Sequence, residues 1–327
     1  MPAARGPIRI GVDLGGTKTE AVVVRLGGLD PEVLARRRVA TERERGYDHI
    51  VEHTCRLVVD VARDAGLDDA ALGEVGVGVG MPGSVTTRRS DGTRSDVPLV
   101  KNSNTTCLNG MPFRADLARA LDRTDIAFAN DANCFALAEA VWGAARGARL
   151  SFGVIMGTGV GGGLVIRDAA GGVRAWDGAQ SIAGEWGHVV LDPSGGDPCY
   201  CGRSGCIETY LAGPAIEREY AARCSGREHV RLPEIAKLAK QGNRIANALI
   251  TERIELFGRA LSIVVNILDP DVIVLGGGVS NLEALYEEGV QALGRWIFND
   301  EVLTRVVKNE LGDSAGVLGA ALLPTLA

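Results

Sequence analysis

The chain is poor in aromatic residues and has no long apolar run. Phenylalanine, tyrosine and tryptophan make up 5% of its 327 residues. No stretch approaches the roughly 20 apolar residues that a membrane-spanning helix needs. The first residues, Met-Pro-Ala-Ala-Arg-Gly-Pro, contain no apolar segment of the kind found in signal peptides. These absences predict a cytoplasmic protein that does not act with a membrane.

Basic residues do not exceed acidic ones, and the cysteines do not suit a disulfide framework. The formal net charge is −6, from 35 Lys and Arg against 41 Asp and Glu, whereas a broad nucleic-acid surface requires a basic excess. The seven cysteines are an odd number, and three of them are clustered, which is typical of metal ligation plus free thiols. The length favours two domains over one compact core.

The clustered cysteines form a candidate metal site. Cys199, Cys201 and Cys206 follow the pattern C-x-C-x₄-C, and His188 lies upstream. One imidazole and three thiolates complete the tetrahedral ligand set of zinc, and four protein ligands favour a structural over a catalytic ion. Glu185 and Glu208 flank this segment. With the second nitrogen of His188, they are candidates to hold a polyhydroxy ligand; the alternative is that both are solvated surface charges.

A strand–glycine turn–strand pattern occurs twice, at residues 8–24 and 153–166. Such duplication predicts two similar α/β domains, each opening with a β-hairpin. Glycine lets backbone N–H groups point into one concavity, and a threonine hydroxyl adds a donor, so these turns suit phosphate. Two such turns predict a nucleotide cleft. The candidate nucleotide-binding residues are Asp13, Gly15, Gly16, Thr17 and Lys18 in the first copy and Gly157, Thr158 and Gly159 in the second.

Two better-known phosphate motifs are excluded by the strands that come after them. Residues 157–162 match G-x-G-x-x-G, and residues 11–19 come close to a P-loop. Both motifs require a helix next, but an apolar strand pattern comes next in each case, as in Leu164–Ile166.

The rest of the chain fits alternating strands and helices. Apolar runs predict strands at 33–40, 75–79, 126–129 and 271–275, and helices are expected over 48–65, with Asp48 as its cap, from 111–112 to 121, and over about 281–297. The last strand runs into Gly276, Gly277 and Gly278. Glycines there allow the close approach of a flat ligand such as adenine.

Asp131 is the candidate general base. It follows the strand at 126–129 and begins a helix that extends to Val141. Ligands of α/β proteins lie at the carboxyl ends of strands, and a carboxylate there can accept the proton of a sugar hydroxyl, an effect typically worth ~10²–10⁴ in rate. Mg²⁺ and the phosphate turns would supply alignment and charge neutralisation. The alternative is that Asp131 or Asn130 is only a helix N-cap.

Taken together, these motifs resemble the bacterial ROK family of sugar kinases, within the actin-like ATPase and hexokinase superfamily. The resemblance spans nearly the whole chain and is carried by segments 13–19, 80–83, 130–133, 157–163, 184–188, 199–208 and 276–278. It implies a two-domain α/β fold of ribonuclease H-like type with an interdomain cleft. The expected domains are 1–130 plus about 314–327, and 131–313 with the zinc site.

The resemblance also implies roles for single residues. Asp131 would be the catalytic base for transfer from ATP to the 6-hydroxyl of a sugar, with Mg²⁺ as cofactor and structural Zn²⁺. His188 would serve zinc and sugar at once. The residues that match sugar-binding positions are Gly83, Asn104, Asn130, Glu185, His188 and Glu208.

Within the family, segments 101–104, 108–110 and 198–201 are most similar to the fructokinase (mannofructokinase) branch, which favours fructose as substrate. Residues 130–137 are shared almost as well with N-acetylglucosamine kinases, so that activity or a glucokinase is the alternative. Cys107 stands where a tryptophan is usual near the sugar-side loop. A homodimer is expected, with sugar and ATP as the small-molecule partners.

Two non-enzyme members of the family are weighed against a kinase. ROK repressors carry a DNA-binding region before the first hairpin, and here the hairpin begins about seven residues in. A non-catalytic sugar sensor is the other alternative, and the intact Asp131 argues against it. We therefore expect an enzyme.

Overall fold

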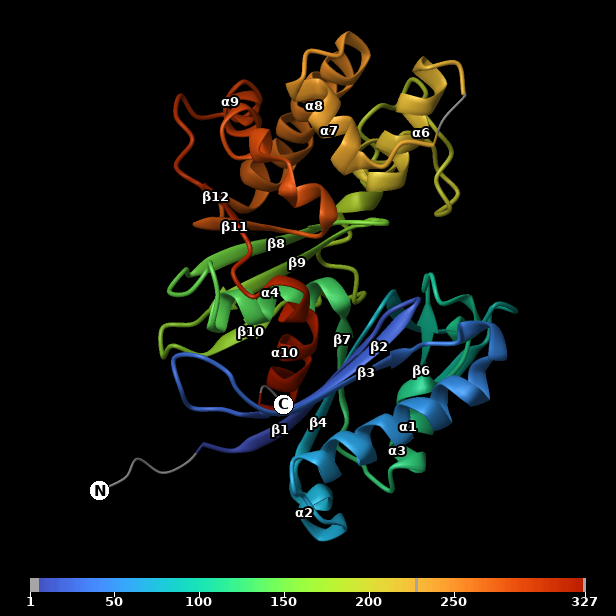
Figure 1. Cartoon of the computed structure of the whole chain (residues 1–327). Helices are drawn as coiled ribbons and strands as arrows, with labels where there is room; N and C mark the ends of the chain where they lie inside the picture. The colour runs from blue at the N-terminus through green and yellow to red at the C-terminus, as the bar shows by residue number, and fades with distance from the viewer. Residues whose placement is uncertain (1–5, 227–228, 326–327) are drawn as a thin grey trace. The chain divides into compact units, whose positions relative to one another are not determined.

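The computed structural model describes residues 6–226 and 229–325, which form two compact units (Figure 1). The first unit takes the chain up to Gly143, Val173–Ala183, and the chain from Leu311 onward; the second takes Ala144–Gly172 and Gly184–Glu310. The domain boundaries expected near 130 and 314 stay a prediction, because a compact unit is not by itself a segment that folds alone.

The first unit is built on a five-stranded mixed sheet in the order β3-β2-β1-β4-β7. The hairpin β1–β2 and strand β3 are antiparallel neighbours, whereas β4 and β7 run parallel to β1. All the strands predicted in this part of the sequence are confirmed. Their bounds are β1 Ile8–Leu14, β2 Lys18–Arg25, β3 Glu32–Ala40, β4 Gly76–Met81 and β7 Ala127–Asn130.

Glycines on one face of this sheet admit helix α10 (Ala315–Leu322). Gly11 and Gly78 are register partners in β1 and β4. A Cβ on Gly11 would lie 2.2 Å from the carbonyl oxygen of Val317, and one on Gly78 would lie 1.9 Å from that of Ala320. Since real Cβ contacts are never so short, only glycine allows the helix to pack this closely on the strands.

The opposite face carries the hydrophobic core with α1 (Tyr47–Asp64) and α3 (Phe113–Ala120). Both helices are confirmed, but Asp48 as the cap of α1 is wrong. The N-cap is Gly46 with φ of 91°, and Asp48 lies inside the first turn, where a carboxylate still interacts favourably with the helix dipole.

The other elements of this unit are η1 (Arg43–Arg45), α2 (Asp69–Glu74), β5 (Ser84–Arg88), β6 (Arg94–Lys101), η2 (Thr106–Leu108), α4 (Asp131–Val141), β10 (Val173–Ala175), η6 (Gly312–Ser314) and η7 (Leu323–Thr325).

The second unit repeats the hairpin-led sheet, as the duplication predicts. Strands β8 (Leu150–Met156) and β9 (Val160–Arg167) form the antiparallel hairpin, and β11 (Val272–Gly276) and β12 (Arg305–Lys308) extend it in parallel, in the order β9-β8-β11-β12. The other elements are η3 (Trp186–His188), α5 (Glu208–Leu211), α6 (Gly213–Arg223), α7 (Leu232–Lys240) and α8 (Arg244–Leu268).

The single helix expected over 281–297 is wrong. The structure has η4 (Gly278–Asn281), η5 (Glu283–Leu285) and α9 (Glu288–Gly294) in its place. Side chains near its start bind local carbonyls: Ser280 Oγ donates to Gly277 O at 2.7 Å and Asn281 Nδ2 to Gly278 O at 3.2 Å. Such bonds compete with the helical hydrogen-bond pattern.

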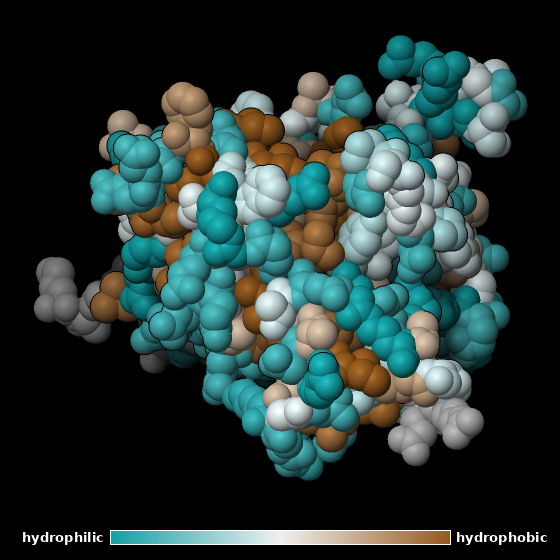
Figure 2. All heavy atoms as spheres, turned by 90° about the horizontal axis from the view of Figure 1, so that it is seen from above, coloured by the Kyte–Doolittle hydropathy of each residue, from teal (hydrophilic) through white to brown (hydrophobic). Residues whose placement is uncertain are grey.

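The helices of the second unit leave some apolar surface in view. Seen from above, apolar side chains gather between hydrophilic ones on this end of the unit (Figure 2). No helix within 6–226 and 229–325 is long and apolar enough to cross a membrane.

Candidate functional site

The candidate residues fall into two groups, one on each unit. In the first unit, the glycine turn between β1 and β2 is closed by the Gly15 N–H, which donates to Lys18 O at 3.1 Å. The end of β3 supports this turn, because Thr41 donates from its hydroxyl to Gly15 O at 2.7 Å and from its backbone to Thr17 O at 3.0 Å.

Asn104 lies beside this turn. A Cβ on Gly16 would lie 3.6 Å from Asn104 Oδ1, and Arg43 donates to the Asn104 carbonyl at 3.4 Å. The structure therefore brings a predicted sugar residue to the predicted phosphate residues of the same unit, although they are nearly ninety positions apart in the sequence.

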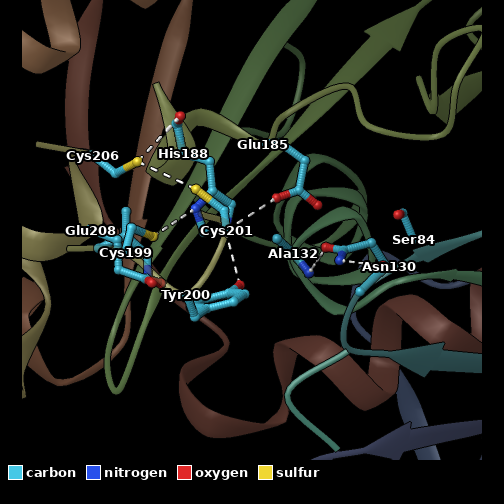
Figure 3. A network of polar contacts seen from close by, with 12 residues as sticks. Ser84, Asn130, Ala132, Glu185, His188, Cys199, Tyr200, Cys201, Cys206 and Glu208 are labelled. Atoms are coloured by element: carbon cyan, nitrogen blue, oxygen red, sulfur yellow. Dashed lines mark hydrogen bonds and ion pairs between the residues drawn. The ribbon is translucent and has the colours of Figure 1, made fainter. Parts of the chain in front are cut away.

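Gly83 and Asn130 are also brought together. Asn130 Nδ2 donates to Gly83 O at 2.9 Å, and its Oδ1 accepts from the Ala132 N–H at 2.9 Å as the N-cap of α4 (Figure 3). Gly83 has φ of 92°, and a Cβ there would lie 2.6 Å from Lys101 O. Glycine is thus required at this turn for both conformation and space.

Asp13 and Asp131 are electrostatic neighbours, at the end of β1 and the start of α4. Burial, followed by the negative charges of Asp131 and Glu20, raises the pKa of Asp13 to about 7. Burial also raises the pKa of Asp131, while the N–H of Ala132, which donates to Asp131 Oδ1 at 2.9 Å, opposes this rise. Raised carboxyl pKa values of this kind are frequent where a proton is transferred.

A small cavity of about 60 Å³ lies beside Asn130 in the same unit. Asn133 and Asp177 line it, and Asn133 Nδ2 donates to Asp177 Oδ1 at 2.8 Å. Burial raises the pKa of Asp177. Sequence reasoning missed both residues. Asn133 stands in the same four-residue motif as Asp131 and was open to discovery, whereas no local pattern marks Asp177.

In the second unit, the four predicted metal ligands are gathered by the fold. The ligand atoms of His188, Cys199, Cys201 and Cys206 all lie within 4.8 Å of one another. Cys201 Sγ is 3.6 Å from Cys206 Sγ, far beyond the ~2.05 Å of a disulfide, and Cys199 Sγ is 3.5 Å from His188 Nδ1. All four side chains therefore offer unbonded ligand atoms to one point.

The two ring nitrogens of His188 have different neighbours. Nδ1 is turned to the sulfur atoms, whereas Nε2 lies 2.9 Å from the Tyr200 hydroxyl and 4.0 Å from Glu185 Oε2 (Figure 3). A ring that binds a metal through Nδ1 carries its proton on Nε2, which then donates to Tyr200. Tyr200 is a further residue that sequence reasoning missed, although it stands between two predicted ligands.

Glu208 holds the second glycine turn. Its Oε2 accepts from the Val160 N–H at 2.9 Å, and a Cβ on Gly159 would lie 2.6 Å from the same oxygen. Gly157 O accepts from the Gly213 N–H at 2.9 Å, at the start of α6. Glu208 is therefore not a solvated surface charge.

Gly277, which follows β11, packs against the neighbouring strand β8. Gly277 has φ of 80°, and a Cβ there would lie 2.4 Å from Met156 O. A hollow of about 570 Å³ begins just beyond this glycine, lined by Asn281, Leu282 and Glu283 together with residues of α7, α8 and α9.

Comparisons with known proteins agree on one family. The ROK family matches residues 9–325. An N-acetyl-D-glucosamine kinase of Escherichia coli O6:H1 is 35% identical over 324 residues, covering 96% of this chain and 98% of the relative. A ROK hexokinase from Thermus thermophilus is 33% identical with a TM-score of 0.80, covering 98% of each chain. A ROK glucokinase from Streptomyces griseus, solved with glucose and AMPPNP, is 26% identical with a TM-score of 0.75 and covers 98% of this chain and all of that one.

A ROK family transcriptional regulator shares the fold as well, at 23% identity and a TM-score of 0.77. The chain covers 78% of that regulator, against 98% or more of the kinases above. These neighbours confirm the expected fold class, the α/β fold of the actin-like ATPase and sugar kinase type. The chain belongs to the ROK family.

Proposed function

We propose that this protein is an ATP-dependent sugar kinase that phosphorylates the 6-hydroxyl of a hexose. The observation that carries the proposal is Asp131, a partly buried carboxylate with a raised pKa at the carboxyl end of β7. Asn130 precedes it in the chain, Asp13 is its electrostatic neighbour, and the same unit holds a glycine turn suited to phosphate with Asn104 beside it. The similar proteins include an N-acetyl-D-glucosamine kinase and a glucokinase.

In this proposal each residue of the first unit has a defined task. Asn104 and Asn130 hydrogen-bond the sugar and fix its orientation. Asp131 accepts the proton of the 6-hydroxyl as that oxygen attacks, and burial favours this role because it raises the proton affinity of the carboxylate. Bound MgATP supplies the phosphoryl group and neutralises its charge. Asp13 faces the same region, where a carboxylate suits the hydrated Mg²⁺.

We propose further that the second unit binds the nucleotide. The turn of Gly157, Thr158 and Gly159 offers backbone N–H groups and one hydroxyl to the phosphates. Gly276, Gly277 and Gly278 precede Asn281, Leu282 and Glu283, which line the 570 Å³ hollow. That hollow has the size of a site for adenosine.

The sulfur cluster fits a structural zinc ion. Zinc bonds of about 2.3 Å to sulfur and about 2.0–2.1 Å to nitrogen place tetrahedral ligand atoms about 3.8 Å (S···S) and about 3.6 Å (S···N) apart. The corresponding distances in the structure are 3.6 Å and 3.5 Å. We propose that the ion holds His188, Glu185 and Glu208 in place as sugar ligands.

The substrate that we propose to test first is N-acetyl-D-glucosamine, because relatives at 35% identity over 96% of the chain are named as kinases of that sugar. Fructose is the second candidate, favoured by the segments at 101–104, 108–110 and 198–201. A glucokinase activity is the third, in view of the relative solved with glucose.

The test measures ADP release by purified protein with MgATP and N-acetylglucosamine, fructose, glucose or mannose, each beside its 6-deoxy analogue where one exists. We expect turnover of at least one hexose and none of its 6-deoxy form. Asp131→Asn should lower turnover by about 10²–10⁴, whereas the matched control Asp96→Asn, an exposed strand position, should not lower it. Absence of ADP release with every hexose would refute the kinase proposal.

The homodimer also stays a proposal, and one surface supports it. Ile267, Phe298 and Leu303 in the second unit are 74%, 100% and 72% exposed. Asn266 joins two of these segments, since its side chain bonds Trp296 O and the Phe298 N–H. Sedimentation analysis of Phe298→Ser tests whether this surface lies between two copies.

A further inference from the structure

A second group of potential metal ligands lies in the first unit, outside the residues discussed so far. Glu42 precedes η1, while His49 and His53 lie on α1, four positions apart, which places both rings on one face of the helix. Their ligand atoms and those of the Glu42 carboxylate all lie within 4.8 Å of one another. The group uses two of the four histidines in the chain.

The two imidazole rings lie against each other, next to the Glu42 carboxylate. They stack with centroids 5.1 Å apart and 29° between planes, and Glu42 Oε2 lies 2.9 Å from His49 Nε2. The Nε2 atom of His53 is buried without any hydrogen-bond partner among the described residues. Because a buried polar atom without a partner costs free energy, it needs an explanation, such as an ion.

We propose that Glu42, His49 and His53 bind a divalent transition-metal ion of the zinc class, separate from the ion at the sulfur cluster. Two imidazole nitrogens and one carboxylate oxygen are a ligand set of zinc and its neighbours, with a fourth position left to water. Tetrahedral ligands at these bond lengths lie about 3.4 Å apart, so the side chains need to close by little more than an ångström.

The ion-pair alternative is specific. Arg45 Nη1 lies 2.9 Å from Glu42 Oε2, the oxygen that also contacts His49. Arg45 can neutralise Glu42 without any ion. It leaves His53 Nε2 without a partner, however, and it does not account for the left-handed backbone of Glu42 (φ 52°), which a non-glycine residue adopts only at a cost.

The site would act as a brace for the first glycine turn. Thr41, next to Glu42, bonds Gly15 and Thr17, and Arg43 bonds Asn104. An ion that ties Glu42 to α1 would fix the segment that supports both the phosphate turn and Asn104.

The test counts metal in the full-length protein. The protein is stripped with a chelator, incubated with Zn²⁺, dialysed and analysed for metal by mass spectrometry. We expect two zinc ions per chain in the wild type and one in either Glu42→Gln or His53→Gln, whereas His229→Gln, an exposed histidine, should keep two. A variant with Cys199, Cys201 and Cys206 all changed to Ser should also keep one.

Substitution with Co²⁺ distinguishes the two sites without an activity assay. In Glu42→Gln and His53→Gln the sulfur-to-cobalt charge-transfer band should be unchanged, while the total cobalt falls by one equivalent. Two variants are used so that a folding defect in one of them, visible in its melting curve, does not decide the result. The proposal would be overturned if both variants fold and bind as much metal as the wild type. It would also be overturned if the variant without the three cysteines binds no metal at all.

Discussion

Replacing Asp13 by Asn should stabilise the protein at neutral and alkaline pH. The pKa of Asp13 rises from the ordinary 3.8 to about 7, chiefly through burial and then through the charge of Asp131. Between these two values the folded state binds a proton that the unfolded state does not. The wild type therefore loses stability as the pH rises from about 4 to about 7, and an uncharged Asn at this position does not.

The magnitude follows from the same pKa values. At 1.36 kcal/mol for each pKa unit, the difference between 3.8 and about 7 corresponds to about 4 kcal/mol. Asp13 is only partly buried, so solvent reduces this figure, and we expect about 2 kcal/mol. For a unit of this size that is an increase in Tm of about 4–8 °C.

The assay is thermal unfolding between pH 4 and pH 8.5, with a chelator and no nucleotide, since a bound cation would screen the carboxylates. The increase in Tm should be absent at pH 4, grow through the interval and level off above about pH 7. Asp96→Asn should change the Tm little at any pH. An Asp13→Asn protein whose Tm is unchanged at pH 8, or raised equally at pH 4 and pH 8, would refute the reasoning. A smaller effect of Asp13→Asn in an Asp131→Asn background would confirm that the two carboxylates repel each other.

Three further predictions test catalysis, packing and the metal site. Asp131→Asn should lower kcat by about 10²–10⁴ with little change in the KM for sugar, and loss through KM alone would contradict a role as base. Gly319→Ala should lower the free energy of unfolding by about 1–3 kcal/mol in urea denaturation, because its Cβ would lie 1.8 Å from Cys134 O. The control is Gly73→Ala, which has open space around it and should not destabilise the protein. Cys206→Ser should lower both the zinc content and the Tm, whereas Cys224→Ser should keep the zinc, and equal metal content in the two variants would remove Cys206 from the site.

The fold was largely predictable because its elements follow local rules. The two hairpins are visible in the sequence as apolar strands around a glycine turn, and both form. The helix expected over 281–297 failed because Ser280 and Asn281 bind carbonyl groups within their own turn. A hydropathy pattern cannot predict such side-chain hydrogen bonds. The cap of α1 failed similarly, since Gly46 takes a positive φ that no apolar pattern marks.

The candidate site was predictable where its residues share one segment. The four predicted ligands of the sulfur cluster lie between His188 and Cys206, and the fold gathers them as the spacing suggests. Asp177 and the pair His49 and His53 were missed because their relevance comes from packing. Asp177 reaches Asn133 across more than forty residues, and Glu42 comes within 2.9 Å of His49 through the backbone turn that precedes α1.

The two glycine turns are similar in sequence, and each is hydrogen-bonded by a side chain that lies close in sequence to a cluster of potential metal ligands. In the second unit, Glu208 accepts from the turn at Val160 and lies two residues after Cys206 of the sulfur cluster. In the first unit, Thr41 bonds the turn at Gly15 and Thr17 and lies next to Glu42 of the histidine cluster. A glycine turn binds phosphate well only if its N–H groups are fixed before the ligand arrives, yet glycine has the most backbone entropy to lose. A side chain tied to a neighbouring ligand cluster removes part of that entropy in advance. On this reasoning the two proposed metal sites would serve phosphate binding and not catalysis itself, and the removal of metal should raise the KM for ATP more than it lowers kcat.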